Sequence, residues 1–335
     1  MTLTKRAQAM ARHYRRVLIG ALLLSMLAAG LGTMFGLGAV VGQYRPNLAK
    51  PFSDWALALV LPLQQAYCDV EDVTVCGVSD AARERLPCDE FQSGNPRHAV
   101  LMTFGQSNSA NFGQTRYTAG PRVANFNIHD GHCYISEDPL LGADGSGGSV
   151  WGILGDSLIA NGAFDRVLIA PFGIGGTSLK EWTVGGRLHP RVKHAAAQLQ
   201  KSGITPTHVL WHQGENDARA GTPQNAYAAM FAELVDSLRD YGINAPVFVA
   251  VATICNDLGS DAIRSAQRGL PDAIEGVYPG ADTDTLSDMH DRHDFCHFSQ
   301  AGLVEHAALW NDSILSFEAI KARTSNAAQT AKEPG

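Results

Sequence analysis

Charged residues are missing from one long stretch near the start of this sequence. Val17 to Gly42 contain no charged side chain, and the residues before them carry five basic side chains and no acidic one. As a helix, this stretch would be about 39 Å long, enough to cross a hydrocarbon core of about 30 Å. A secretory signal peptide is the alternative, but its apolar region is usually shorter and ends at a small-x-small cleavage site, and no convincing site of this kind appears here. The sequence therefore predicts an uncleaved anchor at 17–42, a cytoplasmic basic head at 1–16, and a remainder on the far side of the inner membrane.

Two glycine spacings within this stretch bear on association. Gly32 and Gly36, and likewise Gly38 and Gly42, are separated by three residues, which allows two membrane helices to approach closely. Because glycine is common in membrane spans anyway, they predict only a weak homodimer through the helix.

Clusters of basic residues are missing from the rest of the chain. The formal net charge is −7, and about −12 remains when the five basic residues of the head are set aside. Polyanion binding needs clustered lysine and arginine, so nucleic acid is excluded as a partner.

The paired cysteines of a structural zinc site are also missing. The six cysteines include no C-x-x-C pair, so no metal site is predicted. All six follow the apolar stretch, and an even number in an oxidising compartment favours disulfides, with 15 possible connectivities. We expect Cys255 to pair with Cys296, because such a bond would tie a loop that carries a candidate catalytic histidine to the strand before Cys255.

The remaining chain divides by composition into an extension, a domain and a tail. Residues 43–95 are rich in proline and cysteine and predict a stalk or N-terminal extension, whereas 96–320 alternate short apolar runs with amphipathic stretches. This alternation predicts an α/β domain of three layers, α/β/α, with a parallel sheet covered on both faces. Residues 321–335 predict a flexible tail. The expected strands are 99–104, 166–171, 208–212 and 247–254, and the clearest helices are 223–241 and 300–317.

One serine lies where a predicted strand ends. Val100 to Phe104 form a short apolar run, Gly105 breaks it, and Ser107 follows on the turn. A serine at the carboxyl edge of a sheet is placed where α/β proteins carry out their chemistry. The alternative is an ordinary turn with a serine helix cap.

Three later stretches also place polar or glycine residues at the end of a strand or before a helix. Gly175 and Gly176 can present backbone N–H groups to an anion, and convergent polar side chains follow Trp211. Asp294 precedes His297 by three residues, so its carboxylate can accept a hydrogen bond from one imidazole nitrogen while the other nitrogen faces a nucleophile.

Together these four stretches resemble the SGNH hydrolase superfamily, and more closely its sialate O-acetylesterase-like carbohydrate esterase branch. The resemblance covers His98 to Trp310. The matching blocks are Gly-Gln-Ser-Asn at Gly105 to Asn108, Gly-Gly-Thr-Ser-x-x-x-Trp at Gly175 to Trp182, Trp-x-Gln-Gly-Glu at Trp211 to Glu215, and Asp-x-x-His at Asp294 to His297.

The resemblance implies a flavodoxin-like domain without metal or organic cofactor. In it, Ser107 is the nucleophile, His297 the general base, and Asp294 the residue that orients the base. The oxyanion hole would use the backbone N–H groups of Ser107 and Gly176 and one side-chain amide. Two amides are candidates: Gln213, which we favour slightly because its block is the longer match, and Asn216, which matches the wider superfamily. The residues expected to bind substrate are Gly175, Glu215 and Trp182.

The expected function is a membrane-anchored, periplasmic serine esterase that removes short acyl groups, above all acetyl, from the hydroxyls of a cell-envelope or exported glycan. One alternative is an O-acyltransferase that moves the acyl group to a glycan hydroxyl. The other is a catalytically silent glycan-binding module.

Overall fold

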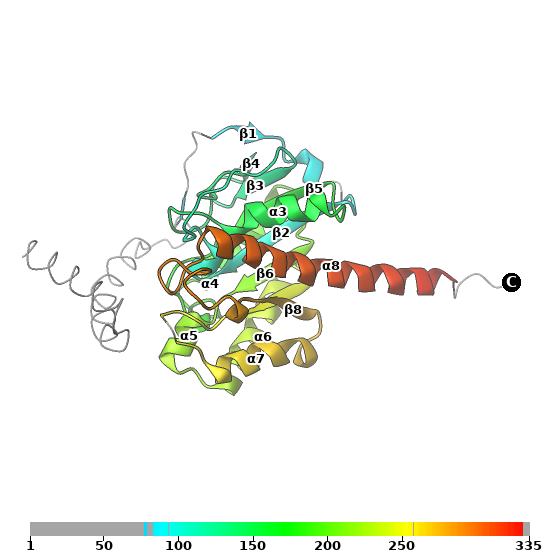
Figure 1. The fold of residues 1–335 in the computed structure, drawn as a ribbon. Coiled ribbons are helices and arrows are strands. Elements are labelled where there is room, and N and C mark those ends of the chain that lie inside the picture. The colour runs from blue at the N-terminus through cyan, green and yellow to red at the C-terminus, as the bar shows by residue number, and fades with distance from the viewer. Residues whose placement is uncertain (1–76, 79–82, 93, 257, 331–335) are drawn as a thin grey trace, which may run out of the picture. The chain divides into compact units, whose positions relative to one another are not determined.

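The described residues form one eight-stranded sheet with helices on both faces (Figure 1). The strand order is β1-β4-β3-β5-β2-β6-β7-β8, and β2 pairs in parallel with β5 on one side and β6 on the other. The β3, β7 and β8 strands are also parallel to their inner neighbours, whereas β4 and β1 are antiparallel. The strands are β1 (Arg85–Leu86), β2 (His98–Gly105), β3 (Val123–Asn127), β4 (His132–Ile135), β5 (Arg166–Pro171), β6 (His208–His212), β7 (Val247–Val251) and β8 (Val277–Asp282).

Side chains of β2 alternate between two apolar cores because successive residues of a strand point to opposite faces. Val100, Met102 and Phe104 join the core on one face, and Ala99 and Leu101 join the core on the other. The first core packs against α4 (His189–Lys201), α5 (Glu215–Ala220), α6 (Gln224–Asp240) and α7 (Asp261–Ala273), and the second against α3 (Val150–Ala160) and α8 (Gln300–Thr330). The mostly parallel sheet and its two helical layers confirm the predicted fold class.

This computed structural model describes residues 77–78, 83–92, 94–256 and 258–330. The predicted anchor at 17–42, the basic head, and Cys68 and Cys76 lie outside the described residues. Within the described ranges, no helix is long and apolar enough to cross a membrane.

Two predicted boundaries differ from the structure. The expected stalk at 43–95 includes residues that belong to the domain, because Arg85 and Leu86 pair with β4 and Phe91 is buried in the first core. The α8 helix continues to Thr330, although we expected the chain to become irregular after 320. We expected irregular chain because the segment after 320 is polar and has no apolar face to bury. A helix can continue without such a face, so the composition did not reveal the extension.

Two disulfides link distant parts of the chain. Cys255 bonds to Cys296, as predicted, and Cys88 bonds to Cys133. The first ties the end of β7 to the loop before α8, and the second ties the segment after β1 to β4.

Candidate active site

The predicted nucleophile lies on a sharp turn at the carboxyl end of β2. Ser107 begins the short 3-10 helix η3 (Ser107–Ser109) and is 5% exposed. Gly105 makes the turn possible, because it has φ +134° and a Cβ there would lie 2.0 Å from the carbonyl oxygen of His212. The turn is then fixed by the Gln106 N–H, which donates to that same carbonyl at 3.0 Å. Ser107 therefore lies just beyond the carboxyl end of β2, the strand that pairs with β5 on one side and with β6 on the other.

The predicted base and its carboxylate are hydrogen-bonded to each other. His297 Nδ1 lies 2.7 Å from Asp294 Oδ2, and Asp294 Oδ1 accepts from the N–H groups of Cys296 and His297 at 3.0 and 2.6 Å. Burial opposes ionisation of Asp294, but the hydrogen bond and charge of His297 outweigh it and hold the pKa of Asp294 well below its usual range. The ionised carboxylate therefore fixes the proton on Nδ1 and leaves Nε2 to face a nucleophile.

The structure brings the nucleophile turn and the histidine loop together. Asn108 Nδ2 donates to the carbonyl oxygen of Cys296 at 3.2 Å, so the chain neighbours of Ser107 and His297 are directly bonded. The ring of Phe112 stacks on the imidazole of His297, with 5.2 Å between the ring centroids and an interplanar angle of 22°. Both contacts join segments that are far apart in the sequence.

Two other histidines lie on the same loop. His290 is exposed and contacts Asp291, and the ring of His293 lies 6.3 Å from that of His297. His293, Asp294 and His297 place possible metal-ligating atoms within 4.8 Å of one another, as do Asp288, His290 and Asp291. In the first group, Asp294 and His297 are already paired with each other, and the second group is mostly exposed.

The glycine loop after β5 packs against the nucleophile turn. The Ile174 N–H donates to the carbonyl oxygen of Gly105 at 3.0 Å, and Gly173 lies against Ser109. Gly175 donates its N–H to Asp144 Oδ2 at 3.1 Å, which leaves Gly176 as the next backbone donor along the loop. The glycine loop therefore lies next to the turn that carries Ser107.

The two candidate amides differ in what they already bind. Gln213 is 0% exposed, and its Nε2 donates to the carbonyl oxygen of Thr177 at 3.1 Å and to Asp217 Oδ2 at 2.6 Å. Both of its amide hydrogens are therefore used inside the protein. Asn216 is half-buried at the start of α5, donates its backbone N–H to Gln106 Oε1 and accepts from Arg219 through Oδ1, and its side-chain Nδ2 donates to no described residue. Of the two candidates, Asn216 is therefore the one whose side-chain amide hydrogens have no acceptor among the described residues.

The predicted substrate contacts of Trp182 and Glu215 need correction. Trp182 is 0% exposed, packs among Phe104, Phe172 and Trp211, and donates its Nε1–H to Thr177. Glu215 is 3% exposed and accepts from Asn108 Nδ2 at 2.8 Å. Trp182 has no exposed surface to offer a substrate, and the Glu215 carboxylate is already held by Asn108 and His212, so both residues support the site from behind. Gly175 is half-buried in the glycine loop.

Sequence reasoning missed several residues that shape the site. Asn108 belongs to the Gly-Gln-Ser-Asn block, but nothing in that block indicated that its side-chain amide reaches the histidine loop. Phe112 carried no signal, because its partner His297 lies far along the chain.

Comparisons with known proteins find a matching family and related structures. A family model described as carbohydrate esterase, sialic acid-specific acetylesterase, matches residues 97–316. The Arabidopsis thaliana protein named "Probable carbohydrate esterase At4g34215" is 29% identical over 204 residues, which are 54% of this chain and 78% of that protein. The X-ray structure of the Arabidopsis protein matches with a TM-score of 0.55 at 20% identity, covering 66% of this chain and 98% of that one. The crystal structure of NanS matches with a TM-score of 0.44 at 18% identity, covering 66% and 98%.

Proposed function

The chain belongs to the carbohydrate esterase, sialic acid-specific acetylesterase family and is a carboxylic ester hydrolase, and from this premise we propose that it removes acetyl groups from sugar hydroxyls through an acyl-enzyme on Ser107. The observation that carries the proposal is the hydrogen-bonded pair of Asp294 and His297, joined to the turn of Ser107 by the Asn108 bond. A serine, an oriented imidazole and a carboxylate are the parts that nucleophilic acyl transfer requires.

The reaction then proceeds in two steps, acylation of Ser107 and hydrolysis of the acyl-enzyme. Ser107 Oγ attacks the ester carbonyl carbon while His297 Nε2 accepts the hydroxyl proton, and the carbonyl electrons move to the oxyanion. When the tetrahedral intermediate collapses, the carbon–oxygen bond to the sugar breaks and His297 protonates the leaving alcohol. Water repeats the sequence on the acyl-enzyme and releases the carboxylic acid. In both steps, Asp294 stabilises the imidazolium.

The oxyanion hole uses the N–H groups of Ser107 and Gly176 together with the side-chain amide of Asn216. The support for Asn216 is that Gln213 donates both amide hydrogens to Thr177 and Asp217. Donors aimed at the developing charge act most strongly in a site that excludes water.

The same proposal places the catalytic domain outside the cytoplasm, on the periplasmic side of the inner membrane. The support is the uncharged stretch from Val17 to Gly42, the basic residues before it, and two disulfides in the domain. An acylated glycan of the cell envelope is accessible there.

The test measures acetate release from an acetylated sugar and from an aryl acetate, with the full chain purified in detergent. We expect release by the wild type, a loss of about 10³-fold or more in both Ser107→Ala and His297→Ala, and a much smaller effect of His293→Ala as the matched control. A fluorophosphonate should label the wild type on Ser107. Persistent labelling of Ser107→Ala would sink the assignment, and acetyl transfer to an added glycan without acetate release would show an acyltransferase instead.

A further inference from the structure

The side chain of Asn108 spans the space between the nucleophile turn and the histidine loop. Its Nδ2 donates both to the carbonyl oxygen of Cys296 at 3.2 Å and to Glu215 Oε1 at 2.8 Å, and the residue is only 6% exposed. Asn108 directly follows Ser107, and Cys296 directly precedes His297. One amide nitrogen therefore connects the two segments whose spacing sets the distance between nucleophile and base.

The peptide group between Cys296 and His297 is held at both ends. Its carbonyl oxygen accepts from Asn108 Nδ2 and from Arg292 Nη1, the latter at 2.5 Å, and its N–H donates to Asp294 Oδ1 at 2.6 Å. Arg292 is itself fixed, because it is buried and donates to the carbonyl oxygens of Leu286 and Thr283. The orientation of this peptide determines where the His297 side chain starts.

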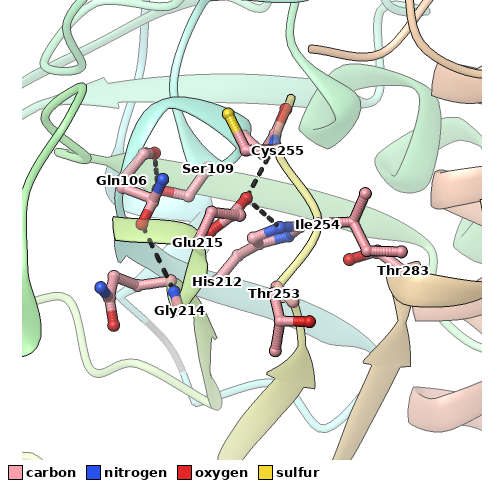
Figure 2. A network of polar contacts seen from close by, with 12 residues as sticks. Gln106, Ser109, His212, Gly214, Glu215, Thr253, Ile254, Cys255 and Thr283 are labelled. Atoms are coloured by element: carbon pink, nitrogen blue, oxygen red, sulfur yellow. Dashed lines mark hydrogen bonds and ion pairs between the residues drawn. The ribbon is translucent and has the colours of Figure 1, made fainter. Parts of the chain in front are cut away.

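Glu215 holds the other side of the Asn108 amide as a buried carboxylate. Burial alone would raise the pKa of Glu215, but the neighbouring His212 and the Asn108 hydrogen bond outweigh it, and the pKa is lowered. His212 Nε2 lies 3.5 Å from Glu215 Oε1, and both side chains are labelled in Figure 2. A charged acceptor makes a shorter and stronger hydrogen bond than a neutral one, so Glu215 restrains Asn108 firmly.

The position of His212 is set from the second helical layer. The indole N–H of Trp310 donates to His306 Nε2 at 2.9 Å, so this nitrogen is an acceptor and must lack a proton. His212 Nδ1 lies 3.1 Å from the same nitrogen. His212 is thus oriented by α8, with its Nε2 directed at Glu215.

We propose that Asn108, held by Glu215, is a positioning residue that sets the spacing between Ser107 Oγ and His297 Nε2. The inference rests on the proposed function of Ser107 and His297. It also gives Glu215 a role behind the site in place of substrate binding. Displacing reacting groups by about 1 Å can cost about 10²-fold in rate, which is the size of effect that this contact controls.

The test is a double-mutant cycle with His297. In the wild-type background, Asn108→Ala should lower kcat for an aryl acetate by about 30- to 100-fold, with KM within about threefold. In the His297→Ala background, the same change should alter the residual rate by less than about threefold, because a residue that acts through the base has nothing left to position. A merely structural role would lower both rates alike.

Two further variants keep the test decisive if Asn108→Ala folds poorly. Glu215→Gln keeps the volume and an oxygen acceptor, and it should lower kcat by about three- to tenfold in the wild-type background only, because the acceptor has lost its charge. Asn125→Ala is the matched control, since Asn125 is an equally buried asparagine whose bonds go to Phe126, Leu141 and Ile169. It should lower the melting temperature while kcat of the folded protein is unchanged.

Rates are normalised to the folded fraction measured by circular dichroism. Losses from Asn108→Ala and Glu215→Gln that multiply fully with that of His297→Ala would overturn the inference, as would an unchanged kcat. An inactive wild type, or one in which Ser107→Ala remains fully active, would instead overturn the proposed function on which the inference depends.

Discussion

At the scale of single residues, Gln213 and Asn216 differ in whether their amide hydrogens are already used. Asn216→Ala should lower kcat by about 10²- to 10³-fold with KM nearly unchanged, which is the effect of removing one oxyanion donor. Gln213→Ala should instead destabilise the fold by about 1–3 kcal/mol, because Asp217 and the Tyr227 hydroxyl lose a buried partner. Steady-state kinetics and urea unfolding of both variants check this, and the reverse order of effects on kcat would return the role to Gln213.

The stacking of Phe112 on His297 leads to a second prediction. The ring lies against Gly175, where a Cβ would be 2.7 Å from Phe112 Cζ, so it is confined between the glycine loop and the imidazole. An aromatic face both orients the imidazole and stabilises the imidazolium that forms during catalysis, by about 0.5–1.5 kcal/mol.

Phe112→Leu should therefore lower kcat by about three- to tenfold, as measured with an aryl acetate. Phe317→Leu is the control, because Phe317 packs against Phe248 and Tyr278 within α8 and the sheet. Equal losses of kcat in the two variants would contradict a specific role for the stacked ring.

At the scale of elements, the two disulfides should have separable effects. Cys255–Cys296 ties the histidine loop to the end of β7, whereas Cys88–Cys133 links the segment after β1 to β4. Each closes a loop of similar length, and each is worth about 3–4 kcal/mol in the chain-entropy model. We expect the double variant Cys255→Ser/Cys296→Ser to lose both stability and kcat.

The matched double variant Cys88→Ser/Cys133→Ser should lose a similar amount of stability but keep kcat. Thermal melts and assays well below the melting temperature distinguish the two results. A similar kcat in the two variants would mean that the first bond does not restrain the base.

The packing of α8 on the sheet should weaken in acid because of His306. Burial, and then the nearby charges of His212 and Arg292, lower the pKa of His306 well below its ordinary 6.5. In the unfolded chain, His306 therefore binds a proton near pH 6.5, whereas in the folded chain it stays neutral at this pH. The stability from the neutral form is complete above this pH and is lost progressively as the pH falls below it, by about 1.4 kcal/mol per pH unit.

Replacement by glutamine removes this titration. The free energy of unfolding in urea at pH 7.5 and 5.5 should fall by about 1.4 kcal/mol less in His306→Gln than in the wild type. His208, whose pKa is also lowered by burial, remains in both proteins. An equal fall in the two proteins would contradict this assignment.

At the scale of the whole molecule, the uncharged stretch predicts where the enzyme is found. The full chain should sediment with membranes and resist alkaline extraction, because an apolar helix of this length inserts stably. A chain that begins at Gln43 should be recovered in the soluble fraction with its esterase activity intact. Release of the full chain by alkaline carbonate would show that residues 17–42 do not anchor it.

The sequence was most informative where local pattern decides structure. β5 and β6 have the predicted bounds, and β2 differs by one residue at each end, because short apolar runs bounded by turn residues form buried strands whatever their neighbours. The pairing of Asp294 with His297 was also predictable, since three residues separate them.

Contacts that depend on the assembled sheet were not predictable in the same way. Trp182 was assigned to substrate from the resemblance of its block, but its position over Phe104 and Phe172 exists only after β2 and β5 pair. Glu215 and Gln213 were predicted to be site residues because they are polar. In the structure, their side chains are hydrogen-bonded inside the protein to Asn108, Thr177 and Asp217.

The two outer strands of the sheet govern how this protein behaves at high concentration. An open strand edge can recruit another chain and start aggregation. On one side, β1 offers only Arg85 and Leu86, and the disulfide after it closes over β4. On the other side, β8 carries Pro279 and Gly280, which are poor residues for further pairing. Because neither outer strand offers a long regular edge, we expect the domain not to aggregate by strand addition at high concentration.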